Sequence, residues 1–145
     1  MINIDYFKQQ AKLLLKDYKT RYYIKEDGIY FYEPKYYQIT EIFLSYDIMD
    51  DNMDDNKKFK FSLMNAQHLI AKLSGFQNWS ELLKASPTML EIAKIRLNCW
   101  KVSGNPNLID EFYGWYIPQC IEDNQVKLDE DTHLQLIKDF VEASK

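Results

Sequence analysis

Apolar residues recur at helical spacing most clearly between Leu63 and Leu73, where the chain contains neither proline nor glycine. Successive residues of a helix are about 100° apart, so most apolar residues of this segment gather on one side. They are Leu63, Ala66, Leu69, Ile70 and Leu73. Met64, His68 and Ala71 fall on the opposite side. A helix with apolar residues on two sides is usually sandwiched between others, so we expect this one to be central.

A tight turn and a second short helix follow this segment. Gly75 stands where a left-handed residue would close the first helix, and Phe76 can fold back onto its last turn. Asn78, with Glu81 three residues later, resembles a capping box and predicts the start of a helix that carries Trp79. We expect the motif of Gly75, Phe76 and Trp79 to be structural.

Helical spacing also marks both ends of the chain. Residues 1–20 form one predicted helix, with apolar residues on one side and lysines on the other. Ser86 and Pro87 predict the start of another, because serine caps well and proline suits the first helical position. This helix is expected to stop at Gly104.

Two more helices are predicted after residue 104. The first opens at Asn105-Pro106-Asn107 and kinks or stops at Pro118. Its aromatic face is expected to consist of Leu108, Phe112, Trp115 and Tyr116. The second is the last helix of the chain, capped by Asp129 or Asp131.

Residues 21–46 have a different character, because they are rich in tyrosine. Two runs of β-forming residues flank Asp27-Gly28, and Asp-Gly between such runs is a strong signal for a β-hairpin. The run from Ile39 to Tyr46 fits either a short helix or a third strand, and we favour the helix. Residues 47–60 follow as an acidic loop.

Together these elements predict a mainly α (α+β) fold. We expect one compact domain over residues 1–145, with about five to six helices and a small β-hairpin annex. In this division, residues 1–20 form a helix, 21–46 the tyrosine-rich hairpin region, 47–60 the acidic loop and 61–145 the helical core. A length of 145 residues suits a single domain.

Nine residues between Ser62 and Leu82 have the spacing of a short helical module that occurs in other proteins. They are Ser62, Ala66, Gln67, Ala71, Gly75, Phe76, Asn78, Trp79 and Leu82. The set resembles the short helical "GF.NW" module of small bacterial proteins labelled as glyoxalase-superfamily-related. The chain has no glyoxalase-type metal site of His and Glu ligands on paired βαβββ units. The resemblance therefore implies a packing unit and no particular activity.

Composition narrows the class of protein. No apolar run approaches 18 residues, which argues against a membrane span. The first residues lack the basic and apolar segments of a secretory signal, so we expect a cytoplasmic protein. The two cysteines, Cys99 and Cys120, lack metal-like spacing, and we expect free thiols.

Residues that carry out chemistry are few. The two histidines, His68 and His133, stand far apart in sequence, and neither belongs to a metal or nucleophile motif. Asp50, Asn52 and Asp54 have the spacing of a calcium loop, but that loop's turn glycine and terminal glutamate are missing. We therefore predict a protein that is not an enzyme and has no catalytic residue, cofactor or metal.

The favoured function is that of a protein-interaction or regulatory module with an unidentified protein partner. Tyrosine offers a broad contact area and a hydroxyl group, so the tyrosine-rich region is the candidate partner surface. Its predicted residues are Tyr22, Tyr30, Tyr32, Tyr36 and Tyr37. The alternative reading of these tyrosines is that they suit half-buried strands.

A second function class is nucleic-acid binding. The segment 63–85 has helix-turn-helix-like spacing, because small Ala71 would let two helices approach and Gly75 would make the turn. The second of these helices carries Lys84 as its only cation, and phosphate contacts require more positive charge. Single-strand binding by the lysines and tyrosines of residues 16–25 is a further possibility. Both readings rank below protein interaction.

Overall fold

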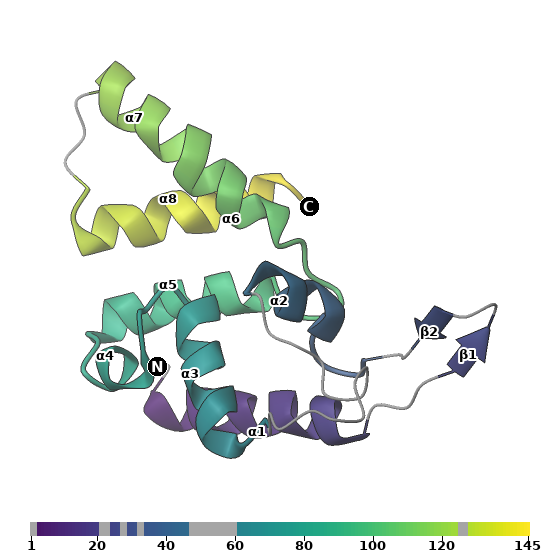
Figure 1. Ribbon diagram of the computed structural model, residues 1–145. Coiled ribbons are helices and arrows are strands. Elements are labelled where there is room, and N and C mark those ends of the chain that lie inside the picture. The colour runs from purple at the N-terminus through teal and green to yellow at the C-terminus, as the bar shows by residue number, and fades with distance from the viewer. Residues whose placement is uncertain (1–2, 21–23, 27–28, 32–33, 47–60, 125–127) are drawn as a thin grey trace.

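The structure is a computed structural model that describes residues 3–20, 24–26, 29–31, 34–46, 61–124 and 128–145 (Figure 1). Its elements in chain order are α1 (Ile4–Thr20), β1 (Ile24–Glu26), β2 (Ile29–Phe31), α2 (Ile39–Ser45), α3 (Leu63–Leu73), α4 (Trp79–Leu83), α5 (Pro87–Asn98), α6 (Asn107–Glu111), the π-helix η1 (Phe112–Tyr116), α7 (Ile117–Asn124) and α8 (Glu130–Ala143). The prediction of a mainly helical chain is confirmed. The helices outnumber the five to six expected, because the predicted aromatic helix continues as α6, η1 and α7.

The larger of two apolar cores lies around α3. This helix packs against α1, α4 and α5, and its buried residues are Ala66, Leu69, Ile70, Ala71 and Leu73. Phe7 and Leu14 of α1 are wholly buried in the same core. Met64, which we expected on a second apolar side, is instead 65% exposed. The prediction that α3 is central therefore holds for its packing, but on the predicted second apolar side Met64 and His68 are exposed and only Ala71 is buried.

Side-chain caps mark the starts of α3, α4 and α8, and those at Asn78 and Asp129 were predicted. The side-chain oxygen of Ser62 accepts a hydrogen bond from the backbone N–H of Asn65 at 3.3 Å. Asn78 caps α4 in the same way, and Asp129 caps α8 by accepting from the Thr132 N–H at 2.8 Å. These bonds satisfy N–H groups that a helix start otherwise leaves unpaired.

A second, smaller core joins α5, η1, α7 and α8. Ile92, Phe112, Ile117 and Ile137 are its buried residues. Because α5 also contributes Leu90, Ala93 and Leu97 to the larger core, it is the element that the two cores share. Figure 1 shows α7 and α8 beyond α5 on the side away from α1.

The sequence predicted that the aromatic helix kinks or stops at Pro118, and the helix does not stop there. Pro118 is the second residue of α7, and the helical path runs without a break from α6 through η1 into α7. Proline has no N–H to donate to the preceding turn, and the residues directly before it form the π-helix η1, in which the Ile117 N–H donates to the Phe112 carbonyl.

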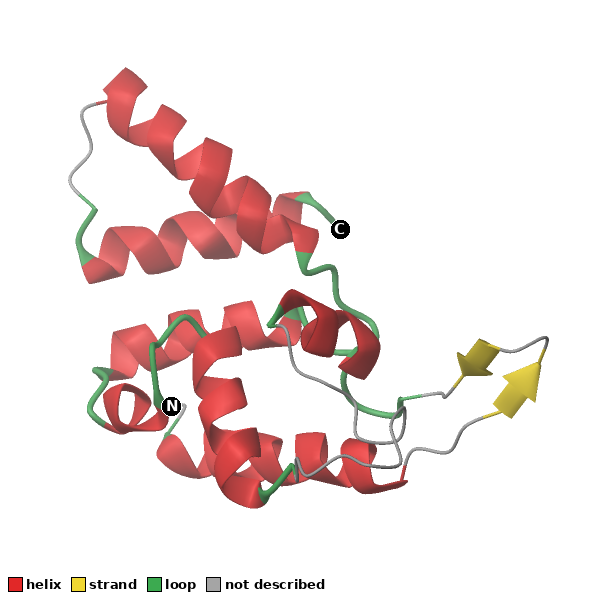
Figure 2. Cartoon of the chain, viewed as in Figure 1, coloured by secondary structure: helices red, strands yellow, loops and turns green. Residues whose placement is uncertain are grey.

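The strands β1 and β2 pair antiparallel, with Lys25 opposite Tyr30. Each strand is three residues long, and Figure 2 shows the pair standing away from the helices. A hairpin annex packed on the helical domain is therefore not supported, since such short strands offer little apolar surface. The run from Ile39 is helical, as favoured, and forms α2.

An unpredicted connection ties residues 34–38 to the segment after α5. Tyr37 and Lys101 form an isolated antiparallel bridge. The Val102 N–H donates to the Tyr36 carbonyl at 3.1 Å, and the Gln38 N–H donates to the Trp100 carbonyl at 3.0 Å. These bonds hold the chain beside α2 against the end of α5.

Candidate functional site

The tyrosines predicted to form one contact surface do not lie together on an exposed surface of the described residues. Tyr22 and Tyr32 lie outside the described residues, and Tyr30 lies in β2. Tyr36 is half-buried. Tyr37 is wholly buried, and its hydroxyl donates to Gln10 Oε1 at 2.5 Å. The Tyr37 ring is thus part of the core and not of a contact surface. Its hydroxyl bonds to α1, and its backbone pairs with Lys101.

The motif of Gly75, Phe76 and Trp79 closes α3 and starts α4. Gly75 has a φ of 101°, the left-handed conformation predicted for it, and a Cβ there would meet Arg96 Cζ at 2.7 Å. Phe76 and Trp79 pack partly buried against the larger core. His68 Nδ1 accepts from the Trp79 N–H at 3.3 Å, so this histidine helps to fix the start of α4.

Metal ligands do not gather anywhere in the described part of the chain. No group of three or more His, Cys, Asp and Glu side chains there is placed to hold a metal ion. The calcium-like series from Asp50 to Asp54 lies outside the described residues. Cys99 is buried, and its thiol donates to the Ile95 carbonyl at 3.5 Å.

The densest cluster of polar and aromatic groups lies between α5, η1 and α8. The Tyr113 hydroxyl and His133 Nε2 are 2.7 Å apart, which is hydrogen-bonding distance. The Arg96 guanidinium lies 4.4 Å from the centre of the Tyr113 ring, a cation–π geometry. Burial lowers the pKa of His133, and the nearby Arg96 charge lowers it further. Arg96 and His133 therefore join α5 and α8 through one tyrosine.

This arrangement makes stability sensitive to pH. The lowered pKa of His133 means that the unfolded chain binds a proton more readily than the folded chain. The free energy of unfolding should therefore fall as the pH drops through about 6.5, the ordinary histidine value. Thermal melts from pH 7.5 to 5 should show a smaller acid loss for His133→Gln than for the wild-type chain.

NMR titration provides the control for this prediction, because the chain has only two histidines. The His68→Gln variant leaves His133 as the sole imidazole to follow. Arg96→Gln should raise the measured pKa of His133, since it removes a facing positive charge. A His133 pKa at or above 6.5 in the folded wild-type chain would contradict the assignment.

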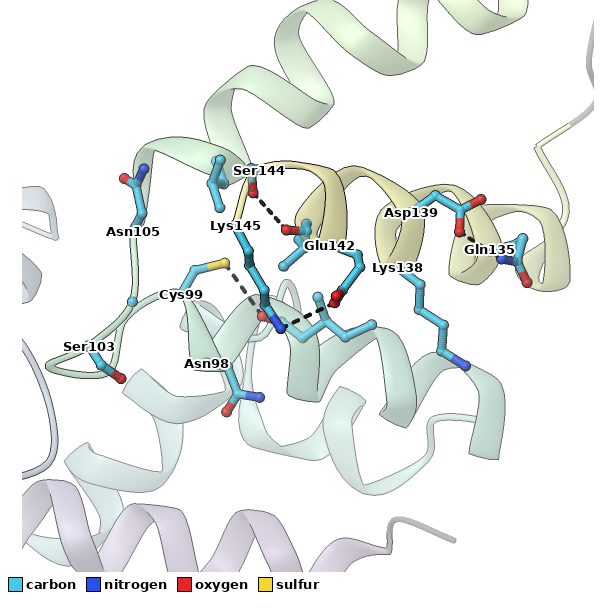
Figure 3. A pocket seen from close by; sticks show the side chains of 14 residues that line it. Asn98, Cys99, Ser103, Asn105, Gln135, Lys138, Asp139, Glu142, Ser144 and Lys145 are labelled. Atoms are coloured by element: carbon cyan, nitrogen blue, oxygen red, sulfur yellow. Dashed lines mark hydrogen bonds and ion pairs between the residues drawn. The ribbon is translucent and has the colours of Figure 1, made fainter.

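A cleft lies between the end of α5, the loop before α6 and the second half of α8 (Figure 3). Its volume is about 730 Å³, which is large enough for a small ligand. Cys99, Ile95 and Val141 are among its apolar lining residues, and Lys138 and Glu142 are among its charged ones. Its charged lining residues are two lysines and two acidic residues, so its charge favours no one class of ligand.

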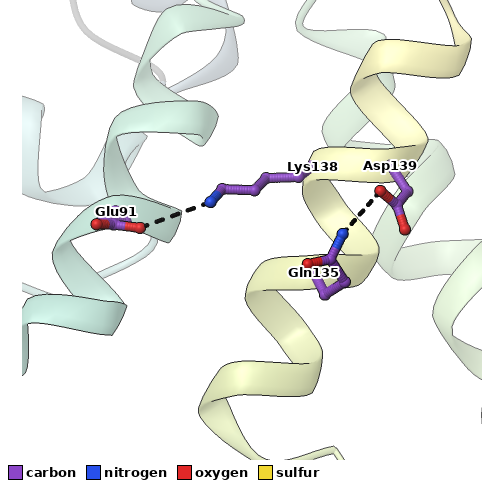
Figure 4. A network of polar contacts seen from close by, with 4 residues as sticks. All are labelled: Glu91, Gln135, Lys138 and Asp139. Carbon is purple, nitrogen blue, oxygen red and sulfur yellow. Dashed lines mark hydrogen bonds and ion pairs between the residues drawn. The ribbon is translucent and has the colours of Figure 1, made fainter.

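The charged side chains of α8 near this cleft are already engaged with neighbours. Lys138 Nζ lies 3.8 Å from Glu91 Oε2 on α5, and Gln135 Nε2 donates to Asp139 Oδ1 at 2.9 Å (Figure 4). Because the Lys138 and Glu91 side chains are substantially exposed, their ion pair contributes little to stability. The Lys138–Glu91 ion pair links α8 to α5, whereas the bond between Gln135 and Asp139 lies within α8.

The most exposed aromatic side chain among the large apolar groups of the described residues is Trp115, in η1. It is 62% exposed, although tryptophan is normally well buried. Gly114 beside it leaves open space where a side chain would stand. Ile121 of α7 is also exposed, at 41%. We call the exposed residues Glu111, Gly114, Trp115, Pro118, Ile121 and Glu122 the Trp115 surface.

The Trp115 surface is the feature that sequence reasoning missed. The spacing of Phe112, Trp115 and Tyr116 predicted one packed aromatic face, but Trp115, which lies within the π-helix, is exposed. The signal present in the sequence was the pair Gly114-Trp115 followed by Pro118, since glycine and proline commonly mark departures from a regular α-helix.

Comparison of the chain with models of protein families, with curated protein sequences and with solved structures finds no match. Within the part of the chain that the structure describes, no helix combines the length and apolar character needed to cross a membrane.

Proposed function

We propose that the chain is a non-catalytic protein-interaction module that binds its partner through the Trp115 surface. The observation that carries this proposal is the 62% exposure of Trp115 on a helix whose neighbouring aromatic residues are packed. Tryptophan is among the residues most enriched where alanine substitution costs binding energy. Short π-helices also occur frequently at functional sites.

Trp115 is held on a rigid support, which favours binding. Phe112 and Ile117, on either side of it in the helix, are buried in the second core. The rings of Trp115 and Tyr116 have centroids 6.5 Å apart, and Tyr116 in turn packs on Phe140 at 4.8 Å. A side chain fixed in this way loses little conformational entropy when a partner covers it.

Charge indicates the chemistry of the partner. The helical path 107–124 contains acidic residues and no lysine or arginine. Asp110, Glu111 and Glu122 are exposed near Trp115 in sequence. A complementary partner is a protein with an apolar pocket for the indole and lysine or arginine at the rim of that pocket. The same acidic character makes this side unsuited to nucleic acid.

The helix-turn-helix reading is weaker than the protein-interaction reading. α4 is five residues long, and its exposed residues include the acidic Glu81, which accepts from the Gln77 N–H at 2.7 Å. A recognition helix of this length would enter a major groove by barely one turn.

We propose that the glyoxalase-related "GF.NW" resemblance reflects the junction between α3 and α4 alone. Cys99 and Cys120 are not joined in a disulfide, which fits action in the reducing cytoplasm.

Substitution of Trp115 tests the proposal. Trp115→Ala should leave the free energy of unfolding within about 0.5 kcal/mol of wild type, because little of the side chain is buried. The variant should weaken partner binding by a factor of about 30 or more, as expected for a tryptophan at the centre of an interface. The partner is first captured from a lysate of the source cells, and its affinity is then measured with purified protein.

Leu44→Ala is the matched control, since Leu44 is 73% exposed on α2, outside the Trp115 surface. It should bind the same partner with unchanged affinity. Glu111→Lys should weaken binding and reverse its salt dependence, because the partner's rim is expected to be basic. A partner that binds Trp115→Ala as tightly as wild type would show that the contact surface lies elsewhere.

A further inference from the structure

A second, smaller pocket lies between α1 and the segment that follows α5. Its volume is about 400 Å³, within the range of small-molecule sites. It is lined by Gln10, Leu13, Lys35, Tyr36, Lys101, Val102 and Ser103. The bridge between Tyr37 and Lys101 brings residues 35–36 and 101–103 together, so the pocket depends on the same long-range connection that fixes the fold here.

Positive charge is concentrated around this pocket. Lys101 Nζ donates to the Tyr6 hydroxyl at 3.2 Å. Lys94 Nζ lies 5.1 Å and Lys101 Nζ 5.6 Å from the centre of the Tyr6 ring, so one tyrosine has two ammonium groups near it. Lys35 Nζ lies 5.7 Å from the centre of the Tyr36 ring. Lys35 and Lys101 therefore line the pocket, and Lys94 shares the Tyr6 ring with Lys101.

Among the described residues, none of these three lysines forms an ion pair with a carboxylate. The nearest buried carboxylate, Asp17, accepts hydrogen bonds from the backbone N–H groups of residues 35–37 and is 4% exposed. Burial lowers the pKa of Lys101, and the like charge of Lys94 lowers it further. A bound anion would favour the protonated form of Lys101 and so raise its pKa again.

We propose that this pocket binds a small organic anion, a phosphate monoester with an apolar or aromatic body. A lysine ammonium group is a compact charge that binds phosphate well. Lys35, Lys101 and Ser103 line the pocket and carry the groups that would hold the phosphate. The Lys101 ammonium, which donates to the Tyr6 hydroxyl in this structure, would donate to the phosphate instead. Leu13, Tyr36 and Val102 form an apolar wall for the body of the ligand. This site is separate from the Trp115 surface and does not rest on the proposed interaction.

Isothermal titration of the full chain with phenyl phosphate tests the proposal. Binding should be saturable with one site per chain, and inorganic phosphate should bind at least ten times more weakly because it lacks the apolar body. Benzyl alcohol, which lacks the charge, should show no saturable binding. Lys101→Met keeps most of the aliphatic length of the side chain and should weaken phenyl phosphate binding at least ten-fold.

Lys84→Met is the matched control, because Lys84 is exposed at the end of α4, away from the pocket lining. It should bind phenyl phosphate as the wild-type chain does. Lys35→Met serves as a second variant on the opposite side of the pocket, and thermal melts establish that both pocket variants are folded. Equal affinity of wild type, Lys101→Met and Lys35→Met for phenyl phosphate would overturn the proposal. So would benzyl alcohol that binds as tightly as phenyl phosphate.

Discussion

Replacing Phe112 with alanine should lower the free energy of unfolding by about 3–5 kcal/mol, because the ring is 1% exposed at the centre of the second core. Four other rings contact it, with centroid distances of 4.8 Å to Tyr113, 5.7 Å to Tyr116, 6.1 Å to His133 and 5.4 Å to Phe140. Removing the ring leaves a cavity that these aromatic groups are too rigid to fill. Denaturant titration followed by circular dichroism measures the loss.

Two control variants show whether the loss of stability comes from the buried ring of Phe112. Phe112→Leu should cost less, because leucine retains much of the buried volume. Trp115→Ala, three residues further along the same helix, removes a larger ring that is 62% exposed and should change stability little. If Phe112→Ala unfolded at the wild-type denaturant concentration, the aromatic cluster would not be what joins α8 to η1.

The local parts of this fold were predictable from the sequence because their causes are local. A side-chain oxygen at Ser62, Asn78 or Asp129 reaches an N–H group only three residues ahead, so the capped helix starts appear in the sequence itself. Gly75 was predictable for the same reason, since its left-handed φ of 101° closes the helix directly before it.

The burial of Tyr37 could not be predicted in this way, because its partners are remote. Its hydroxyl bonds to Gln10, 27 residues away, and its backbone bridges to Lys101. Tyrosine alternation along residues 30–37 indicates strand-like surface, but nothing in it shows which ring a distant helix will cover. The smaller pocket was missed for the same reason, since its lining residues come from separate segments of the chain that meet only in the folded protein.

The prediction that Trp115 is packed was wrong for a different physical reason, which is the number of residues in each turn of the helix. At α-helical spacing, residues three and four apart share a face, which would bring Trp115 onto the side of Phe112. A π-helix has more residues in each turn, because its hydrogen bonds run from i to i+5. Over Phe112–Tyr116 this change rotates Trp115 away from the packed side, so a regular 3.6-residue pattern gave the wrong face.

The other large stability effect is expected at Asp17, where one buried carboxylate holds the segment that follows the hairpin. Its Oδ1 accepts from the Lys35 N–H at 3.1 Å, and its Oδ2 accepts from the N–H groups of Tyr36 at 2.7 Å and Tyr37 at 2.8 Å. Asp17→Ala leaves these donors without their acceptor in a place that water reaches poorly. We expect a loss of about 3–5 kcal/mol in the free energy of unfolding.

Hydrogen exchange distinguishes this specific role from a general loss of packing. In Asp17→Ala under native conditions, the amide hydrogens of Tyr36 and Tyr37 should exchange much faster than in wild type, while those of α8 should change only as far as global stability falls. Asp17→Asn keeps one acceptor oxygen and should fall between wild type and Asp17→Ala. Asp5→Ala, an exposed position on the same helix, should resemble wild type. Unchanged protection at Tyr36 and Tyr37 in Asp17→Ala would mean that the bridge to Lys101, and not the carboxylate, fixes this segment.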